Sequence, residues 1–168
     1  VLGFCLPRSI YAHKSAIVDY KYYSLYFVLT GPFHIGSLII STSLMGGYCK
    51  SLLQHIFGPV ESHSEAGLSA RVIFMIVVYL ALDIGFFIAH YLEHKVPFFW
   101  EFHKVHHSAE VLNPFTNFRQ HPVDVILQGT LTSLFAGTVG GIFGFFYNGL
   151  DFITIFNISV INLAYLFT

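Results

Sequence analysis

The hydrophobic residues of this chain gather into four long stretches, separated by shorter polar segments, at residues 22–45, 72–92, 123–146 and 151–168. A helix needs roughly 20 apolar residues to cross a hydrocarbon core about 30 Å thick. Each stretch comes close to that length. The pattern therefore predicts an all-α integral membrane protein with about four transmembrane helices and one histidine-rich interfacial helical segment.

Glycine and proline indicate where these helices are expected to break. Gly31-Pro32 interrupts the first stretch, which is either one kinked helix or two short pieces. Residues 46–71 are rich in turn-forming residues and are predicted to form a loop. The third stretch contains two glycine pairs with the four-residue spacing of close helix contacts, Gly137/Gly141 and Gly140/Gly144.

The polar segment 95–122 combines charges, aromatic residues and histidines. Pro97 should end the second helix near the preceding residue. Residues 98–107 are then predicted to form a short interfacial helix, with aromatic side chains at headgroup level. His121 precedes Pro122, and proline suits the first position of a following helix.

Composition supports the membrane class and excludes others. Only 10% of the 168 residues are charged and 55% are hydrophobic, whereas soluble domains carry about 25% charged residues. The length is that of a single membrane domain covering residues 1–168. A net charge of −1 offers no basic face to nucleic acid.

The distribution of Lys and Arg predicts an orientation. With a cytoplasmic N-terminus and four spans, the cytoplasmic side holds six basic residues, and the opposite side holds Lys50 and Arg71. Basic residues accumulate on the cytoplasmic side of membrane proteins. We therefore expect the histidine-rich segment to face the cytoplasm, in a bacterial inner membrane or the endoplasmic reticulum.

Five of the ten histidines lie between positions 90 and 107. His90 and His94 have i,i+4 spacing, which places them on one helix face with Cβ atoms about 6 Å apart. Two imidazoles so placed can bind one ion at roughly 2.0–2.1 Å, and His103 and His107 repeat the spacing. Because His106 and His107 differ by about 100° around a helix, the set fits two metal ions better than one.

We favour a metal site over the simpler interpretation that these are amphipathic histidines lying at headgroup depth without a ligand. A single histidine is comfortable at headgroup depth without any ligand, but a dense cluster beside a hydrophobic stretch is costly unless it has a function. All-imidazole ligation suits Zn, Cu, Fe or Ni, and spacing does not choose among them.

Other polar residues are candidates for supporting roles. His121 could be a further ligand or could hold one in place. Asp83 is the single charge of the second stretch; such residues usually face the protein interior, where it could support a ligand histidine or fix helix packing. Glu93, Glu101 and Glu110 are out of phase with the histidines and are predicted to lie on solvated faces. The scattered histidines, His13, His34, His55 and His63, are predicted not to be ligands.

Residues 83–122 read DIGFFIAHYLEHKVPFFWEFHKVHHSAEVLNPFTNFRQHP. They contain an Asp-bearing helix, an HxxxH box, an aromatic-rich W-x-F-H-x-x-H-H box, an S-A-E turn and an R-x-H-P element. In these motifs the chain resembles the fatty acid hydroxylase / sterol desaturase superfamily of membrane di-iron enzymes. Residues 13–23 resemble that superfamily more loosely.

The resemblance implies an O2-dependent non-haem di-iron oxidoreductase that hydroxylates or desaturates a C–H bond of a lipid, such as a sterol or a fatty acyl chain, in lipid biosynthesis. It implies two iron ions, O2 as co-substrate, and an external electron donor such as cytochrome b5, a ferredoxin or an NAD(P)H-linked reductase. By position the metal ligands would be His90, His94, His103, His106 and His107, with His121 a weaker carry-over and Asp83 a supporting residue.

Members of this superfamily carry a third histidine box after the fourth hydrophobic stretch. This chain stops at Thr168, about where that box would begin, so we expect it to be an internal fragment of a longer protein. Five or six imidazoles cannot saturate two irons in the manner of the superfamily. Residues 1–168 alone are therefore expected to bind metal poorly and to turn over nothing.

Two other classes of protein would use the same histidines. A haem-binding membrane electron carrier ligates haem through paired histidines, usually from facing helices, and a Soret band would identify it. A membrane metal transporter needs polar ligands along a crossing path, where the second stretch offers Asp83. Metal uptake by vesicles without any O2-dependent lipid product would identify that class.

Overall fold

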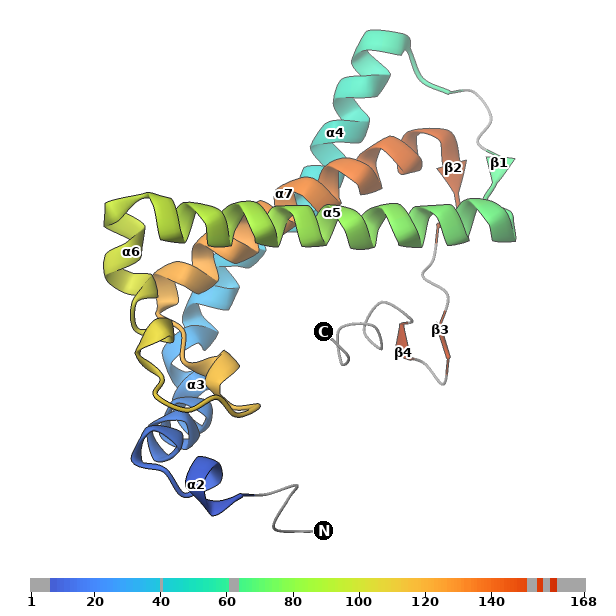
Figure 1. Ribbon diagram of the computed structural model, residues 1–168. Helices are drawn as coiled ribbons and strands as arrows, with labels where there is room; N and C mark the ends of the chain where they lie inside the picture. Colours follow the sequence, from blue (N-terminus) through green and yellow to red (C-terminus); the bar gives the residue numbers. More distant parts are fainter. Residues whose placement is uncertain (1–6, 40, 61–63, 151–153, 156–157, 160–168) are drawn as a thin grey trace. The chain divides into compact units, whose positions relative to one another are not determined.

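The computed structural model describes residues 7–39, 41–60, 64–150, 154–155 and 158–159, and this part of the chain is predominantly helical (Figure 1). The α-helices are α2 (Arg8–Tyr11), α3 (Lys14–Ile39), α4 (Thr42–Phe57), α5 (Leu68–Lys95), α6 (Pro97–His103) and α7 (Pro122–Phe146). Two single-turn 3-10 helices follow α6, η1 (His106–Ser108) and η2 (Thr116–Phe118). Strand β1 (Ser64–Glu65) pairs in parallel with β2 (Tyr147–Asn148), and β3 (Thr154–Ile155) pairs antiparallel with β4 (Ile158–Ser159).

Contacts divide the chain into two compact units. The first unit comprises residues 1–37 and 88–129, and it contains the whole histidine-rich segment. The second unit comprises residues 38–87 and 130–168. Its core is built where α5 and α7 supply Phe74, Met75, Val78 and Ala136.

Within the described residues, two helices, α5 and α7, are long and apolar enough to cross a membrane. They contain the predicted stretches 72–92 and 123–146, whose helical character is confirmed. Large apolar side chains also point outward from α5, including Ile73, Ile76 and Phe87, which are 54%, 56% and 66% exposed. An outward apolar face of this kind suits a lipid environment.

The other two predicted spans turned out differently. Helix α3 continues past Gly31-Pro32 to Ile39, and the break comes later, where the Ser41 hydroxyl accepts the Leu44 N–H at 3.2 Å and caps α4. A capping side chain satisfies an N–H that has no partner within the helix, and so it favours a new helix start at that point. In the fourth stretch, β3 and β4 take up the described residues, and the rest of 151–168 lies outside the described residues.

The prediction of a loop over residues 46–71 is wrong at both ends, where the structure has helix. Residues 46–57 belong to α4, and only 58–67 connect α4 to α5. Gly46, in the predicted loop, lies instead on the face of α4 that packs against α7. A Cβ on Gly46 would lie 3.3 Å from the Gly137 carbonyl oxygen of α7. Close backbone approach between two helices requires this lack of side chain.

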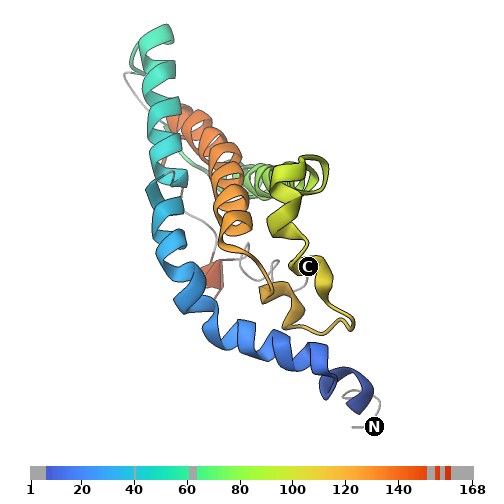
Figure 2. The same ribbon diagram turned by 90° about the vertical axis from the view of Figure 1, so that its left-hand side faces the viewer.

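Only one of the two glycine pairs of α7 makes this contact. A Cβ on Gly137 would lie 2.5 Å from the Met45 Cβ, and one on Gly141 would lie 2.5 Å from the Cys49 Cβ. Nothing described lies within 4 Å of a Cβ placed on Gly140. The Gly137/Gly141 pair is therefore the helix-packing face, and α4 runs alongside this part of α7 (Figure 2).

Gly141→Ala is expected to lower stability by about 1–3 kcal/mol, because the added methyl overpacks the contact with Cys49 and with the Gly46 backbone. The matched control is Gly140→Ala, which meets open space and should be neutral or slightly stabilising, since alanine is the better helix former. Thermal unfolding of both variants in detergent measures the difference. Equal melting temperatures would show that α4 and α7 do not touch at this point.

A buried ion pair organises the segment that leads into α7. Asp19 of α3 is fully buried, and its Oδ1 accepts a hydrogen bond from Arg119 Nε at 2.7 Å. Its Oδ2 accepts hydrogen bonds from the Thr116 hydroxyl at 2.8 Å and the Asn113 amide at 2.7 Å. Arg119 also donates to the Ser15 carbonyl at 2.7 Å. The loop that follows the second histidine box is thereby attached to α3.

Candidate metal centre

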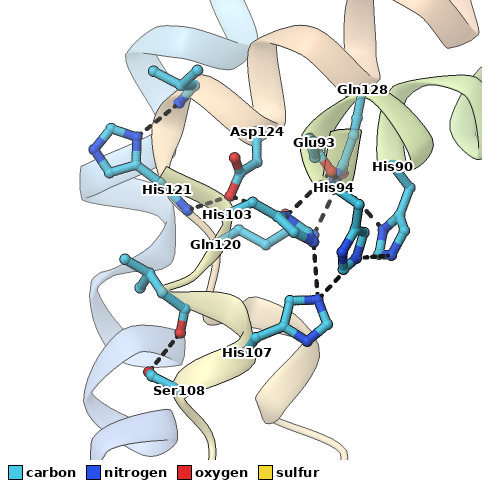
Figure 3. Close-up of polar contacts among 12 residues, drawn as sticks. His90, Glu93, His94, His103, His107, Ser108, Gln120, His121, Asp124 and Gln128 are labelled. Carbon is cyan, nitrogen blue, oxygen red and sulfur yellow. Dashed lines mark hydrogen bonds and ion pairs between the residues drawn. The ribbon is translucent and has the colours of Figure 1, made fainter. Parts of the chain in front are cut away.

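The break between α5 and α6 brings the two histidine boxes together. Helix α5 ends at Lys95, Val96 has extended backbone angles, and Pro97 is the first residue of α6. Proline disfavours helical geometry in the residue before it and fits the start of a new helix. The prediction that the second helix ends before Pro97 is confirmed. The chain turns at this point, so His103 and His107 face back toward α5 (Figure 3).

Four imidazole Nε2 atoms converge at this turn (Figure 3). The Nε2 atoms of His90 and His94 are 3.1 Å apart, and His107 Nε2 lies 3.1 Å from both His94 Nε2 and His103 Nε2. All four nitrogens lie within 4.8 Å of one another. The i,i+4 spacing of each box thus gives two pairs of nitrogens that meet at one point.

This geometry fits a metal ion. Donors held at 2.0–2.1 Å by a tetrahedral ion are about 3.3 Å apart, close to the separations seen here. A neutral imidazole carries one proton, so four converging nitrogens cannot all satisfy one another by hydrogen bonds. A cation that accepts the four lone pairs resolves this conflict. The donor set is all-nitrogen, which suits a transition metal rather than calcium or magnesium.

His106 lies beside this group but is not a member of it. Helix α6 ends at His103, and His106 begins η1, which changes its direction relative to a continuous helix. Its ring stacks at 5.5 Å from the His103 ring and lies 5.3 Å from the His107 ring. Its Nδ1 is buried and has no hydrogen-bond partner among the described residues. The expectation that His106 is a ligand stays a prediction.

His121 caps helix α7. Its Nδ1 accepts the Val123 N–H at 3.2 Å, and its backbone N–H donates to Asp124 Oδ2 at 3.2 Å. This reciprocal arrangement resembles a capping box, but the His121 ring accepts the N–H of the second helical residue rather than the third. The His121 ring also packs on Phe102 at 4.7 Å. His121 lies outside both candidate metal groups, and its predicted role at the metal stays untested.

Asp83 was expected to face the interior, and the structure has its side chain exposed. The packed face of this part of α5 is marked by Gly85, where a Cβ would lie 2.8 Å from the Leu131 carbonyl oxygen. Positions 83 and 85 are about 200° apart around a helix, so Asp83 points away from that contact. No hydrogen bond or ion pair of Asp83 is seen within the described part of the chain. The predicted role of Asp83 in supporting a ligand histidine therefore stays a prediction.

The prediction that Glu93 lies on a solvated face is wrong. Glu93 is fully buried, with its Oε2 3.3 Å from His103 Nδ1, and Gln128 Nε2 donates to its two oxygens at 3.2 and 3.1 Å. It lies about 60° around α5 from His90, on the side where α7 packs. Glu101 and Glu110 are exposed as expected.

Sequence reasoning also missed Asp124 and the Asp19–Arg119 pair. Asp124 is fully buried, and its Oδ2 lies 3.7 Å from His103 Nδ1. Together with Glu93 and His103 it forms a second group with ligand atoms within 4.8 Å of one another. The sequence did carry one signal for Asp124, which is its position in the predicted helix. It is the third residue of a helix that begins with proline, and an acidic side chain there commonly accepts a backbone N–H at the helix start.

Burial and the neighbouring imidazoles lower the pKa values of His103 and His107. Burial, and then the neighbouring imidazoles, with His90 first, lower the pKa of His103 to about 4. Burial also lowers the pKa of His107, with His106 and His94 adding to the effect. Neutral imidazole is the form that binds a metal ion, so these lowered pKa values favour the binding form of His103 and His107.

The stability of the metal-free protein should fall as the pH is lowered from 6.5 to about 4. In this window the unfolded chain protonates His103, whereas the folded chain, with the lowered pKa, does not. The slope is up to roughly 1.4 kcal/mol per pH unit, and above 6.5 neither state binds the proton. Thermal unfolding across the window measures the effect. His103→Gln should flatten the profile; an unchanged slope in that variant would assign the dependence to other groups.

Comparison with known proteins agrees with the motifs. A family model described as fatty acid hydroxylase matches residues 75–167, a segment that includes every histidine of the cluster. No curated protein and no solved structure matches the chain. The matched segment covers more than half of the 168 residues. The chain belongs to the fatty acid hydroxylase family.

Proposed function

We propose that this protein oxidises an unactivated C–H bond of a lipid with O2 at a histidine-bound di-iron centre, as a hydroxylase or a desaturase. The observation that carries the proposal is the convergence of four Nε2 atoms, from His90, His94, His103 and His107, within 4.8 Å. Family membership supports the reaction class. The apolar faces of α5 and α7 support a substrate and a protein that share the bilayer.

The chemistry must balance with an outside source of electrons. Hydroxylation places one oxygen atom of O2 in the C–H bond and reduces the other to water, which consumes two electrons and two protons. Desaturation removes two hydrogen atoms from the lipid and reduces both oxygen atoms to water with the same input. The electrons come, in this proposal, from cytochrome b5, a ferredoxin or an NAD(P)H-linked reductase, and iron, when bound, supplies the O2 activation.

The residues of the chain prepare the centre. His90 and His94 present their Nε2 atoms from the last turn of α5, and His103 and His107 present theirs from the turn that follows. The Trp100 ring lies 5.5 Å from the His94 ring and 5.7 Å from the His107 ring, and so packs against one histidine of each box. Four nitrogens suffice for one ion, so a second ion needs further donors, of which His106 is the adjacent candidate.

The direct test uses the protein as its gene encodes it, purified with native lipid. We expect about two irons per chain and an oxidised lipid product that depends on O2 and on a reductase. Sterol, fatty acyl and sphingolipid substrates are supplied in parallel, and the product identifies the substrate class. A Soret band with haem, or metal uptake by vesicles with no oxidised product, would replace the proposal by an electron carrier or a transporter.

The proposal places the cluster at the cytoplasmic surface. The excess of Lys and Arg that the sequence predicts on that side supports this orientation. Labelling of single cysteines, introduced at exposed positions such as Glu101, by a membrane-impermeant reagent tests it. We expect the introduced cysteine to react only when the reagent is given access to the cytoplasmic side of the membrane.

A further inference from the structure

His103 has its two ring nitrogens in different surroundings. Its Nε2 is 3.1 Å from His107 Nε2, inside the four-histidine cluster. Its Nδ1 points the other way, toward Glu93 Oε2 at 3.3 Å and Asp124 Oδ2 at 3.7 Å (Figure 3). The His103 side chain is 2% exposed and both carboxylates are fully buried. Water therefore does not compete for this contact.

The proton of His103 has one suitable position. A neutral imidazole carries its proton on one nitrogen, and the other nitrogen is the metal donor or hydrogen-bond acceptor. If Nε2 binds an ion, the proton is on Nδ1, which then needs an acceptor. Nδ1 and Asp124 Oδ1 are both buried and make no well-formed hydrogen bond with the described residues. A small adjustment of the His103 ring would complete the bond to Glu93.

The Glu93 carboxylate is itself held in place. Gln128 Nε2 donates to both of its oxygens, at 3.2 and 3.1 Å. Gln120 Nε2 in turn lies 3.5 Å from Gln128 Oε1, which orients the Gln128 amide toward Glu93. Asp124 is fixed at the start of α7 by its bond from the His121 N–H. Both carboxylates are therefore positioned before any ion binds.

We propose that Glu93, assisted by Asp124, is a positioning residue that holds the Nδ1 proton of His103 and so keeps Nε2 directed, unprotonated, into the cluster. The inference rests on the proposed function, because it assigns these carboxylates a role toward the metal held by the histidines. Partners of this kind on a ligand histidine orient the ring and strengthen the ligand.

A second cation bound directly by Glu93, His103 and Asp124 is the competing arrangement, since their ligand atoms lie within 4.8 Å. It would require His103 to lose the protons of both nitrogens, because Nε2 already serves the cluster. It would also compete with the two hydrogen bonds that Gln128 donates to Glu93. The positioning role requires neither change.

The first test needs no metal and reads the His103 proton directly. Nitrogen-15 NMR of the metal-free protein distinguishes a proton on Nδ1 from one on Nε2. We expect the Nδ1 form in the wild type and a mixture of the two forms in Glu93→Leu. Glu93→Gln keeps an acceptor oxygen and the side-chain volume, and is expected to retain the Nδ1 form. A proton on Nε2 in the wild type, or no change in Glu93→Leu, would overturn the inference.

The second test measures Co²⁺ binding and its visible spectrum in the same proteins. Glu93→Leu is expected to weaken Co²⁺ binding about 10–100-fold with a shifted spectrum, and Glu93→Gln to weaken it less. The matched control is Glu101→Gln, an exposed carboxylate on α6 paired with Lys104, which should leave both unchanged. Thermal unfolding separates loss of fold from loss of binding.

The results separate failure of the positioning role of Glu93 from failure of the metal centre itself. A wild-type protein that binds no Co²⁺ would contradict the metal centre, whatever the NMR shows. Binding within twofold of the wild type in both Glu93 variants would contradict the positioning role while leaving the centre intact. An additional equivalent of Co²⁺ that disappears in Asp124→Asn would show a second cation site and overturn the positioning role.

Discussion

His107→Ala is expected to reduce metal affinity by more than the 10–100-fold that is typical of changes around a ligand. The Nε2 atom of His107 lies 3.1 Å from those of His94 and His103, so it links the nitrogens of the two boxes. Without it three donors remain and one coordination position opens to water. Titration of the purified protein with Co²⁺ measures the loss, and lipid oxidation should be lost with it.

The control for this prediction is His55→Ala. His55 is an exposed histidine of α4 that belongs to neither candidate metal group. The His55→Ala substitution removes the same kind of side chain at a position outside the cluster. Metal affinity and melting temperature should therefore stay at wild-type values. Equal losses in the two variants would mean that Co²⁺ binds nonspecifically to surface imidazoles. Unchanged affinity in His107→Ala would remove the basis for the proposed centre.

Asp19→Ala is expected to destabilise the protein by about 3–5 kcal/mol, because it leaves the Arg119 guanidinium buried without its counter-charge. The Asp19 carboxylate also accepts hydrogen bonds from Thr116 and Asn113, which would lose their partner. The segment between α6 and α7 should loosen first. Chemical unfolding in detergent measures the stability, and hydrogen exchange locates the loosened segment.

Two comparisons isolate the cause. Glu101→Ala removes an exposed ion pair with Lys104, and pairs of this kind contribute about 0–1 kcal/mol. The double variant Asp19→Leu/Arg119→Met replaces both charges by apolar groups and should recover much of the lost stability. Failure of the double variant to recover stability would assign the effect to the hydrogen bonds of Asp19 rather than to the unpaired Arg119.

The histidine cluster was predictable because its information is local. The i,i+4 spacing of His90 and His94 determines that they share a face of α5. His103 is the last residue of α6 and His107 lies in η1, about one turn further along the chain. Pro97 indicated the turn that brings the pairs together. The spanning length of α5 and α7 could likewise be read from consecutive apolar residues.

Errors arose where a residue's role depends on a distant neighbour. Gly46 was interpreted as part of a loop, because its contact partner Gly137 on α7 lies some ninety residues away in the chain. Glu93 was interpreted as solvated, since nothing near it in sequence indicates that Gln128 and Asp124 cover it. Asp83 was expected inside from the cost of a charge in lipid, and its helix presents the opposite face to α7.

By itself, the amino-acid sequence indicated the helical class, the family and six candidate ligand histidines, since each depends on composition or on motifs that are local in the chain. The structure brings together four of the six, His90, His94, His103 and His107. The tertiary structure decided which carboxylates accompany those imidazoles. Glu93 and Asp124 come from α5 and α7, and Asp19 meets Arg119 across one hundred residues. A buried charge needs a partner close in space, and only the packing of helices determines which partner that is.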